Sequence, residues 1–367
     1  MKNVLIVCVY PKDKVPGQRF RFEQYLDYLS ANGFNITFSN LLNEKDYSFY
    51  YKKGNYLKKA FLVLKSIIKR YKEVKSASRY DIIFIFRECF FLGSSYFERK
   101  FAKKSKVIFD YDDAIWITST VSENNKWLWF LKNPNKTRQI IEVSQMVFAG
   151  NEYLAKYARQ FNNNAVIIPT TIDTSKYLPA YNPEKDKICI GWSGSFSTIV
   201  NFTTCIEALK IVKKKYQDKV YFKVIGSADY HNAELNIQGL PWRKESEVKD
   251  LQEIDIGIMP LPDDDWAKGK CGLKGLQYMA LAIPTIMSPV GVNSEIIEDG
   301  INGFLASDTN EWVNKLSLLI DSKNLRKTMG YKGRETVVSR FSIESNKILY
   351  LQYFTKVAEM SSVDNGL

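Results

Sequence analysis

The sequence predicts a protein of the α/β class with two parallel-sheet domains, and three observations support this prediction. The chain has 367 residues, which exceeds one ordinary hydrophobic core and suits two domains. Short apolar segments alternate with amphipathic ones, a pattern typical of parallel strands joined by crossover helices. The charge is also unevenly divided, because residues 1–180 carry 29 basic and 16 acidic side chains whereas residues 181–367 carry 23 and 24.

Short apolar segments are the expected strands of the two sheets. The connection between the domains contains prolines at positions 169, 179 and 183. We therefore expect an N-terminal domain at residues 1–172, a hinge at 173–186, a second domain at 187–340 and a C-terminal helix within 341–367. The expected strands are residues 4–9, 35–38, 82–86, 107–110, 146–149 and 165–168 in the first domain, and 188–191, 220–225, 256–259 and 284–287 in the second.

Cysteine content and hydropathy indicate a cytoplasmic location. The five cysteines are scattered without the paired spacing of a disulfide framework, which suits a reducing compartment. No apolar run in the sequence approaches the roughly 18 residues of a membrane span. The apolar residues 4–10 are followed by Pro11 and Asp13 without a small-residue cleavage site, so we expect a buried first strand and not a signal peptide.

The strongest basic cluster lies in residues 52–79, which contain ten lysines and arginines and one acid, Glu73. Two interpretations are open: a core helix with a solvated basic side, or a contact with anionic lipid or a lipid-diphosphate acceptor. Nucleic acid is the least favoured partner, because the chain lacks nucleic-acid-binding motifs. The residues at helical spacing are Leu57, Phe61, Leu64, Ile68 and Tyr71 on the apolar face and Lys58, Lys65, Lys69 and Lys72 on the other.

Residues 268–306 are the segment most suited to binding an anion. The segment opens with a glycine-containing loop that carries Lys268, Lys270 and Lys274, continues into an apolar helix, and reaches a second helix near Asn293. A loop that leads into a helix N-terminus presents backbone N–H groups to an anion, and the lysines add positive charge. The sequence therefore predicts a diphosphate site in this segment.

The order and spacing of short motifs in this segment resemble the donor-sugar site of GT-B retaining glycosyltransferases of family 4. Gly269 and Gln277 stand where the family has glutamates, and glutamine offers one neutral acceptor oxygen in place of a carboxylate. The motifs are CGL at 271–273, QYMA from Gln277, Pro284, Val290 with Gly291, EII from Glu295, Asp299 with Gly300, and Gly303.

This resemblance implies a GT-B fold, in which two Rossmann-like doubly wound domains face each other across a cleft and the C-terminal helix packs back on the first domain. It implies transfer of a sugar from a UDP- or GDP-sugar, with retention of configuration and with no metal or other cofactor. The expected acceptor is a glycan or lipid-linked hydroxyl in the biosynthesis of capsule, O-antigen or lipopolysaccharide. The basic first domain suggests peripheral contact with the inner face of the cell membrane.

The candidate donor contacts follow predicted strands of the second domain. Gly194, Ser195 and Thr198 belong to a turn between a strand and a helix, as in phosphate-binding turns. Lys274 is the expected catalytic contact to the departing phosphate. Glu295 matches a family glutamate that holds donor hydroxyls, although it also suits the first turn of an ordinary helix. The other candidates are Gly226, Met259, Lys270, Cys271, Gly272, Leu273 and Gln277.

The candidate acceptor contacts lie at the carboxyl ends of strands in the first domain, where ligands of doubly wound sheets bind. Gly17 precedes two arginines, Arg19 and Arg21, which can bind a phosphate or an acidic sugar or can simply be surface residues of a helix start. Arg87 and Glu88 follow a predicted strand, where they can also form a plain ion pair.

A third loop carries Asp112, Asp113 and Trp116, and its DDAIW segment resembles a subset of the family 4 enzymes. Many relatives have a histidine there, whereas the one histidine of this chain is His231 in the second domain. Asp112 or Asp113 is therefore expected to accept a hydrogen bond from the incoming hydroxyl or the donor sugar. The alternatives are a helix N-cap and a metal-binding pair of the GT-A kind, which does not suit two domains joined by a hinge.

Two further functions use the same donor site. A sugar-nucleotide epimerase with the GT-B fold would convert the donor without an acceptor. A non-catalytic donor-binding subunit is compatible with the glycine and glutamine at the two family glutamate positions.

Overall fold

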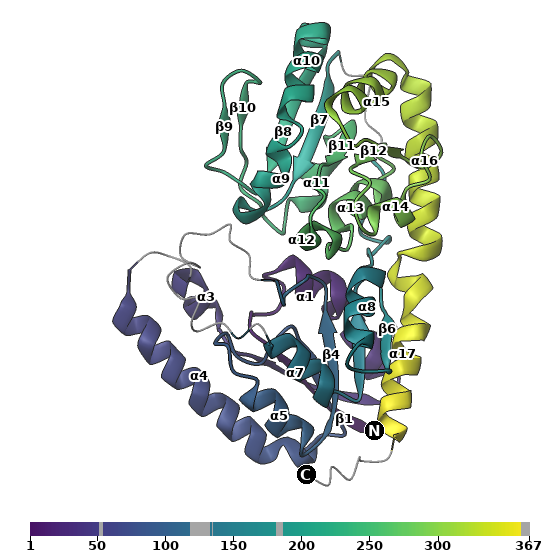
Figure 1. The fold of residues 1–367 in the computed structure, drawn as a ribbon. Coiled ribbons are helices and arrows are strands. Elements are labelled where there is room, and N and C mark those ends of the chain that lie inside the picture. The colour runs from purple at the N-terminus through teal and green to yellow at the C-terminus, as the bar shows by residue number, and fades with distance from the viewer. Residues whose placement is uncertain (51–53, 118–132, 134, 181–185, 361–367) are drawn as a thin grey trace. The chain divides into compact units, whose positions relative to one another are not determined.

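The computed structural model describes residues 1–50, 54–117, 133, 135–180 and 186–360, and the chain divides into two compact units (Figure 1). Unit 1 consists of Met1–Pro169 and Lys347–Leu367, and unit 2 consists of Thr170–Asn346. Each unit has its own parallel sheet with helices packed on it, so the predicted α/β class with two doubly wound domains is confirmed. Of the predicted hinge at 173–186, residues 181–185 lie outside the described residues.

Unit 1 is built on a six-stranded parallel sheet. Its central strands are buried almost throughout, and they read as continuous apolar runs because helices cover both faces. The strands lie in the order β2 (Phe34–Asn40), β1 (Lys2–Cys8), β3 (Ile82–Phe86), β4 (Lys106–Tyr111), β5 (Met146–Ala149) and β6 (Ala165–Ile167).

The register of this sheet brings three loops to one edge. Val7 of β1 pairs with Ile85 of β3, and Phe86 of β3 pairs with Asp110 of β4. Because all three strands run in the same direction, the loops that follow them leave the sheet together. Among its described residues before Pro169, unit 1 has the helices α1 (Pro16–Arg21), α2 (Leu26–Ala31), α3 (Glu44–Tyr50), α4 (Tyr56–Ser76), α5 (Tyr96–Ala102), α7 (Lys136–Val143) and α8 (Glu152–Arg159), with short 3₁₀ turns at Glu23–Tyr25 and Ala77–Arg79.

The last helix, α17 (Ile343–Glu359), returns the chain to unit 1 from Lys347 onward. Tyr350 stacks on Tyr25 with ring centroids 4.3 Å apart. Phe354 is fully buried, and its ring lies 5.8 Å from that of Phe84. The helix therefore completes the core of a unit whose other elements come from the first half of the chain.

Unit 2 has a five-stranded parallel sheet and a separate two-stranded hairpin. The sheet order is β13 (Phe304–Leu305), β12 (Thr285–Met287), β11 (Ile256–Met259), β7 (Ile188–Ser193) and β8 (Val220–Ile225), and the hairpin pairs β9 (His231–Asn232) with β10 (Ile237–Gln238). The helices are α9 (Ile199–Thr203), α10 (Ile206–Tyr216), α11 (Glu247–Gln252), α12 (Asp265–Lys268), α13 (Leu273–Ala280), α14 (Asn293–Ile296), α15 (Thr309–Asp321) and α16 (Lys323–Arg340), with 3₁₀ turns η4 (Phe196–Thr198) and η5 (Gln217–Lys219).

The helix predicted in the basic segment is α4, but its apolar row does not face the core. Leu57, Phe61 and Leu64 are 89%, 68% and 55% exposed. The buried side chains of α4 are Leu62, Ser66, Arg70 and Val74. The interpretation of the apolar row as a core face is therefore wrong, and Lys52 and Lys53 lie outside the described residues.

Within the described ranges of the chain, none of the helices combines the length and the apolar content that crossing a membrane requires.

Candidate functional site

The turns that follow β7 and β8 lie against each other in unit 2. Gly226 has φ +96°, and a Cβ placed on it would lie 1.7 Å from the carbonyl oxygen of Gly194. The Gly194 N–H donates to the carbonyl of Ile225 at 2.9 Å, and the Gly226 N–H donates to that of Leu240 at 2.7 Å. Only glycine fits this crossing, and both of these N–H groups are used within the protein.

Ser195 and Thr198 form a capping box around the 3₁₀ turn η4. The Ser195 N–H donates to Thr198 Oγ1 at 2.9 Å, and the Thr198 hydroxyl donates to the Ser195 carbonyl at 3.1 Å. The Ser195 side chain is exposed and that of Thr198 is half-buried. The turn therefore presents hydroxyl groups, while the N–H of Ser195 is used to hold its own shape.

The first turn of α13 combines a helix N-terminus that lacks a side-chain cap with a lysine. Gly272 occupies the N-cap position with φ +69° and has no side chain that could accept hydrogen bonds from the first N–H groups. No acidic side chain lies in this turn, whereas Lys274 does. The positive end of the helix dipole and an ammonium group therefore act at one place, as in many phosphate sites.

Lys274 extends to the carboxyl end of β7. Its Nζ lies 5.5 Å from the centre of the Trp192 ring. The same ring packs under Gly194, where an added Cβ would lie 2.2 Å from it. The structure thus brings Lys274 and the Gly194 turn together around a buried tryptophan.

The other two lysines of the predicted diphosphate site have different neighbours. Lys268 Nζ lies 3.5 Å from a carboxylate oxygen of Asp263 and 3.6 Å from one of Asp265. Lys270 Nζ lies 4.9 Å from the centre of the Trp266 ring. Lys274 is thus the lysine of the three whose ammonium group lies beside the β7 turn.

Contacts with the segment after β12 fix the loop before α13. Gly291 has φ +56°, and a Cβ placed on it would lie 2.7 Å from the Lys268 carbonyl oxygen. A Cβ on Gly272 would lie 2.4 Å from Ile296 Cδ1. The predicted donor residues Cys271 and Met259 are 9% and 3% exposed, so they pack in the interior of unit 2 beside this loop and at the end of β11. Leu273 is half-buried at the start of α13.

Asn293 is a polar residue near this loop that the sequence did not single out as a site residue. It is fully buried, and its Nδ2 donates to the Ser288 carbonyl at 3.0 Å. Its Oδ1 has no hydrogen-bond partner among the described residues. A buried asparagine between two glycine turns has no sequence signal beyond its position at a predicted helix start.

Gln277 lies in a buried hydrogen-bond network within unit 2. Its Nε2 donates to the Tyr177 hydroxyl at 3.0 Å and to Glu247 Oε1 at 3.2 Å. Glu247 also accepts hydrogen bonds from the Tyr177 hydroxyl at 2.9 Å and from Trp242 Nε1 at 2.9 Å. Gln277 is 4% exposed, so its amide group is directed at Glu247 and not at solvent. A glutamate here would place two carboxylates side by side.

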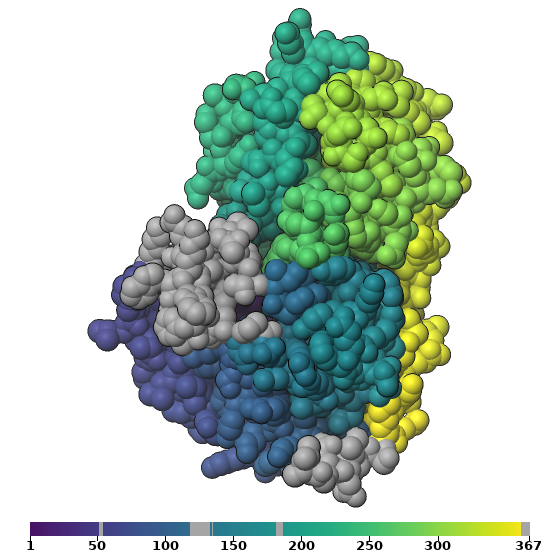
Figure 2. Space-filling view, in the orientation of Figure 1, coloured from purple at the N-terminus to yellow at the C-terminus, as the bar shows by residue number. Residues whose placement is uncertain are grey.

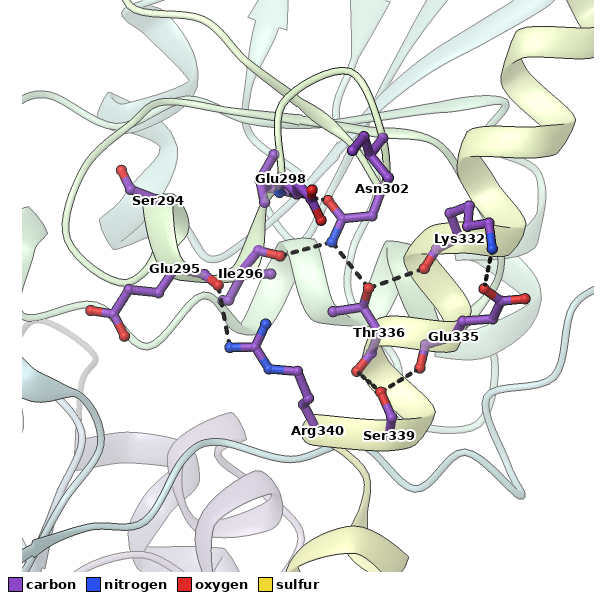
Figure 3. Close-up of a pocket in the computed structure, with 12 residues that line it drawn as sticks. Ser294, Glu295, Ile296, Glu298, Asn302, Lys332, Glu335, Thr336, Ser339 and Arg340 are labelled. Carbon is purple, nitrogen blue, oxygen red and sulfur yellow. Dashed lines mark hydrogen bonds and ion pairs between the residues drawn. The ribbon is translucent and has the colours of Figure 1, made fainter.

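Glu295 borders a pocket of about 680 Å³ between α14 and α16 (Figure 3). The pocket wall is held by hydrogen bonds from Asn302 Nδ2 to the Ile296 carbonyl and to the Thr336 hydroxyl, both at 3.0 Å. The Glu295 carboxylate points away from these groups, while its carbonyl accepts a hydrogen bond from Arg340 at 3.4 Å (Figure 3). Of the predicted donor residues, Glu295 lines this pocket.

In unit 1, the loops after β3 and β4 meet through Arg87. Its Nε donates to Asp112 Oδ1 at 2.7 Å, and its Nη2 donates to Asp113 Oδ2 at 2.5 Å. Burial alone would lower the pKa of Arg87, but the two carboxylates outweigh it and raise the pKa above its ordinary value. Arg87 has φ +59°, a strained backbone conformation for a side chain of this size, as often occurs at functional sites.

Gly17 joins the same cluster from the first turn of α1, the helix that follows β1. A Cβ placed on Gly17 would lie 3.0 Å from Asp112 Oδ2 and 3.3 Å from Arg87 Nη2. The structure therefore brings together Gly17 from α1, Arg87 from the loop after β3, and Asp112 and Asp113 from the loop after β4, at one edge of the sheet. Both carboxylates pair with the guanidinium of Arg87. The N-cap interpretation, in which an aspartate accepts a hydrogen bond from a helix N–H, does not account for this pairing.

The remaining predicted acceptor residues are engaged elsewhere in unit 1. Arg21 is 1% exposed and forms a buried ion pair with Asp110, so its guanidinium does not reach the loop surface. The Arg19 guanidinium lies over the Phe20 ring at 5.0 Å. Glu88 pairs with Lys136 at 2.8 Å, whereas Arg87 pairs with Asp112 and Asp113, so the two neighbours have separate partners in place of the predicted ion pair between them. Trp116 stacks on Tyr157 with ring centroids 3.8 Å apart.

Across the parts of the chain that the structure describes, no group of three or more His, Cys, Asp or Glu side chains could hold a metal ion. Independence of a metal remains a prediction.

The second unit matches a known family. Residues 187–322 match the family model described as Glycosyl transferases group 1. An uncharacterized glycosyltransferase of Methanocaldococcus jannaschii is 39% identical over 66 residues, which are 17% of this chain and 19% of that protein. The chain thus aligns with about a fifth of the length of this curated relative.

Solved structures of glycosyltransferases resemble the chain over nearly its whole length. The chain is 15% identical to a sucrose-phosphate synthase from Thermosynechococcus elongatus, with a TM-score of 0.72 and coverage of 97% of this chain and 99% of that one. HepE from Anabaena, solved in complex with UDP-glucose, gives 12% identity, a TM-score of 0.66 and coverage of 97% and 100%. A glycosyltransferase from Rickettsia africae is 14% identical, with a TM-score of 0.66 and coverage of 98% of this chain and 99% of that one. At these identities the likeness concerns the fold.

The loop before α13, the turns after β7 and β8, and Gln277 all lie within the matched residues 187–322. The chain therefore has the two Rossmann-like domains of the GT-B fold, and residues 187–322 of its second unit match the model of the glycosyl transferases group 1 family.

Proposed function

We propose that the protein is a glycosyltransferase that moves a sugar from a nucleoside-diphosphate donor to a hydroxyl group of an acceptor. The observation that carries this proposal is the N-terminus of α13, which lacks a side-chain cap, has Lys274 in its first turn and lies within the matched domain. Such a helix end favours a diphosphate over a neutral ligand.

Lys274 and the first N–H groups of α13 would bind the phosphate that carries the sugar. When the bond between C1 of the sugar and the phosphate oxygen breaks, the diphosphate gains charge, which these groups stabilise. A bond then forms between C1 and the acceptor oxygen, and the hydroxyl proton passes to the departing diphosphate. This route retains the configuration at C1 and uses no metal ion.

A UDP-sugar is the first donor to test, with a GDP-sugar as the second. HepE, whose fold this chain resembles, was solved in complex with UDP-glucose. In this chain Gln277 donates to Glu247, so the carboxylate of this pair belongs to Glu247.

The acceptor is proposed to bind unit 1 at the cluster of Gly17, Arg87, Asp112 and Asp113. The aspartates would accept the hydrogen bond of the incoming hydroxyl, with Arg87 holding them in place. We propose a glycan or lipid-linked acceptor of surface polysaccharide biosynthesis, such as capsule, O-antigen or lipopolysaccharide. The excess of basic residues in 1–180 supports a cytoplasmic protein bound peripherally to the anionic inner face of the cell membrane, through residues 52–79.

A panel of nucleotide sugars tests this proposal. The purified protein is incubated with each sugar and with extracted lipid-linked glycans as acceptors, with and without EDTA, and products are followed by NMR of the anomeric proton; a parallel incubation without acceptor detects epimerisation. We expect UDP release that survives EDTA and that falls at least about tenfold in Lys274→Ala but not in Lys214→Ala, a change of an exposed lysine on α10. Conversion of the donor to an epimer would support the epimerase instead, and binding without any turnover would support a non-catalytic subunit.

A further inference from the structure

Helix α4 departs from the usual polarity of a surface helix, because polar side chains are buried on it beside Leu62 and Val74 while larger apolar ones are exposed. Its buried side includes Ser66 and Arg70, which are 1% and 0% exposed. Its outward side carries Phe61, Leu64 and Ile68, which are 68%, 55% and 48% exposed. In an ordinary surface helix the apolar residues would face the core and the polar ones would face water.

Specific polar contacts of Arg70 fix this orientation. Its Nε donates to the Cys89 carbonyl at 2.8 Å, and its Nη2 donates to the Cys8 carbonyl at 2.7 Å. Its Nη1 donates to Glu73 at 2.6 Å and to Ser39 Oγ at 3.0 Å. Glu73 lies on α4 itself, so a rotation of α4 that buried the apolar row would keep that bond but would break the three bonds to Cys8, Ser39 and Cys89 and leave buried groups unpaired. The apolar row is therefore held outward by the fold of unit 1.

The exposed apolar row runs along α4 from its first residue, Tyr56, to Tyr71. Figure 1 shows α4 at the outer side of unit 1, and in the space-filling view its dark blue atoms form the left edge of that unit (Figure 2). A continuous row of this kind differs from scattered surface apolar residues, and it marks an interaction surface. The row consists of Tyr56 (80% exposed), Leu57 (89%), Phe61 (68%), Leu64 (55%), Ile68 (48%) and Tyr71 (45%).

Basic side chains flank the apolar row. Lys58, Lys65 and Lys72 recur every seven residues, which places them on one side of the row, and all three are exposed. Lys100, Lys103 and Lys104 add exposed positive charge near the C-terminal end of the helix, where the Lys104 Nζ lies 3.5 Å from the Lys75 carbonyl. Lysines beside an apolar row can keep their ammonium groups at phosphate level while the apolar side chains enter the acyl region.

We propose that the outer face of α4 is a membrane-docking surface that inserts its apolar row into the headgroup boundary of an anionic lipid bilayer. Charge complementarity favours this occupant, because a row of lysines beside aromatic and aliphatic side chains matches anionic headgroups above acyl chains. A second copy of the chain would bring the same lysines together. The inference rests on the proposed peripheral contact and adds to it the inserting face and its residues.

Vesicle flotation with the full chain tests the proposal. We expect the protein to float with vesicles of phosphatidylglycerol and phosphatidylethanolamine, and to float poorly with phosphatidylcholine vesicles or at high salt. A triple variant with Phe61→Gln, Leu64→Gln and Ile68→Gln should reduce binding at least about tenfold. A matched control with Ile211→Gln, Leu318→Gln and Ile348→Gln removes side chains of 46%, 44% and 59% exposure from other helices and should bind as the natural protein does.

A fluorescent label tests insertion directly. All five natural cysteines are buried, so a cysteine introduced by Leu64→Cys would be the main site of labelling by an environment-sensitive dye. We expect its emission to shift to the blue on addition of anionic vesicles, whereas a label at Ile211→Cys on α10 should not change. Equal emission at both positions, or flotation of the triple variant at the natural level, would overturn the proposal.

Two further measurements separate the possible failures. If no vesicle binds but the triple variant converts a dimer to a monomer in light scattering, the face is a self-association interface and the lipid proposal is wrong. UDP-glucose binding is measured on the natural protein and on every variant. Absence of binding by the natural protein would count against the proposed function, whereas loss of flotation with donor binding intact concerns the docking face.

Discussion

At the residue scale, Gln277 is the side chain whose identity the structure explains most directly. Its amide donates to Glu247 inside a buried network, where a glutamate would oppose an existing carboxylate. We expect Gln277→Glu to reduce the free energy of unfolding of unit 2 by about 3 kcal/mol at pH 7.5, because it buries an uncompensated charge. Urea denaturation followed by tryptophan fluorescence measures the change.

The neutral variant Gln277→Met is the control for this substitution. It removes the same hydrogen bonds without adding charge, so it should cost less than the glutamate variant. Equal stability of the glutamate variant and the natural protein would show that the two side chains do not meet in solution.

Glu98 in unit 1 gives a prediction about pH. It is fully buried, and burial raises its pKa, although Lys136 at 3.9 Å and the Cys89 N–H at 2.9 Å act in the opposite direction. Because the folded pKa exceeds the unfolded one, its contribution to stability is complete below the unfolded pKa of about 4.3 and is lost as the pH rises through the folded value.

Glu98→Gln should remove this dependence on pH. The urea midpoint of the natural protein should therefore fall relative to that of the variant as the pH is raised from 4.5 to 8. A difference between the two urea midpoints that stays constant over this range of pH would mean that the pKa of Glu98 is the same in the folded and unfolded protein.

At the element scale, the crossing of the β7 and β8 turns is a backbone contact that tolerates no side chain. In Gly226→Ala the new Cβ would lie 1.7 Å from the Gly194 carbonyl oxygen at φ +96°. Gly300→Ala is the matched control in the same unit, because Gly300 has φ +82° but its Cβ would meet no atom closer than 4.0 Å.

We expect Gly300→Ala to lower the melting temperature by about 3 °C, since it adds only backbone strain. Gly226→Ala should lower it more than twice as far and should also weaken donor binding. Circular dichroism measures the melting temperatures and titration calorimetry measures donor binding. Equal melting temperatures for the two variants would contradict the close backbone contact between the turns after β7 and β8.

The sequence predicts the parallel strands well because each is a buried apolar run between polar turns. It misses β9, β10 and β13, which are two residues long and have no periodicity of their own. It detects the two faces of α4 but leaves open whether the apolar one packs on the core. The deciding contacts join Arg70 to Cys8 and Cys89, which lie 62 and 19 residues away along the chain.

The candidate site shows the same division between local and long-range information. The loop before α13 and Lys274 are recognisable from local spacing, because a helix start with glycine and lysine is a short motif. The contact of Gln277 with Glu247 joins residues 30 positions apart, and no local pattern specifies it. The burial of Arg21 likewise depends on Asp110, which is 89 positions away.

At the scale of the whole molecule, the chain leaves unit 1 after Pro169 and returns to it at Lys347. We expect Phe354→Ala on α17 to destabilise unit 1 by about 3–5 kcal/mol, because this fully buried ring packs on Phe84. Ile348→Ala on the same helix is the control, since Ile348 is 59% exposed.

Hydrogen exchange with mass spectrometry distinguishes the units in this experiment. Peptides from β1, β3 and β5 should exchange faster in Phe354→Ala, while peptides from β7, β8 and β11 should not change. Faster exchange confined to unit 2 would mean that the last helix belongs to the other core.

The most direct measurement for the molecule as a whole is calorimetric titration of the full chain with UDP-glucose and a panel of other nucleotide sugars. We expect one of them to bind with a dissociation constant of about 1 mM or lower, and we expect Lys274→Ala to weaken it at least about tenfold while Lys214→Ala leaves it unchanged. If no nucleotide sugar binds at millimolar concentration, or if Lys274→Ala binds as tightly as the natural protein, the helix end at α13 does not hold a donor diphosphate.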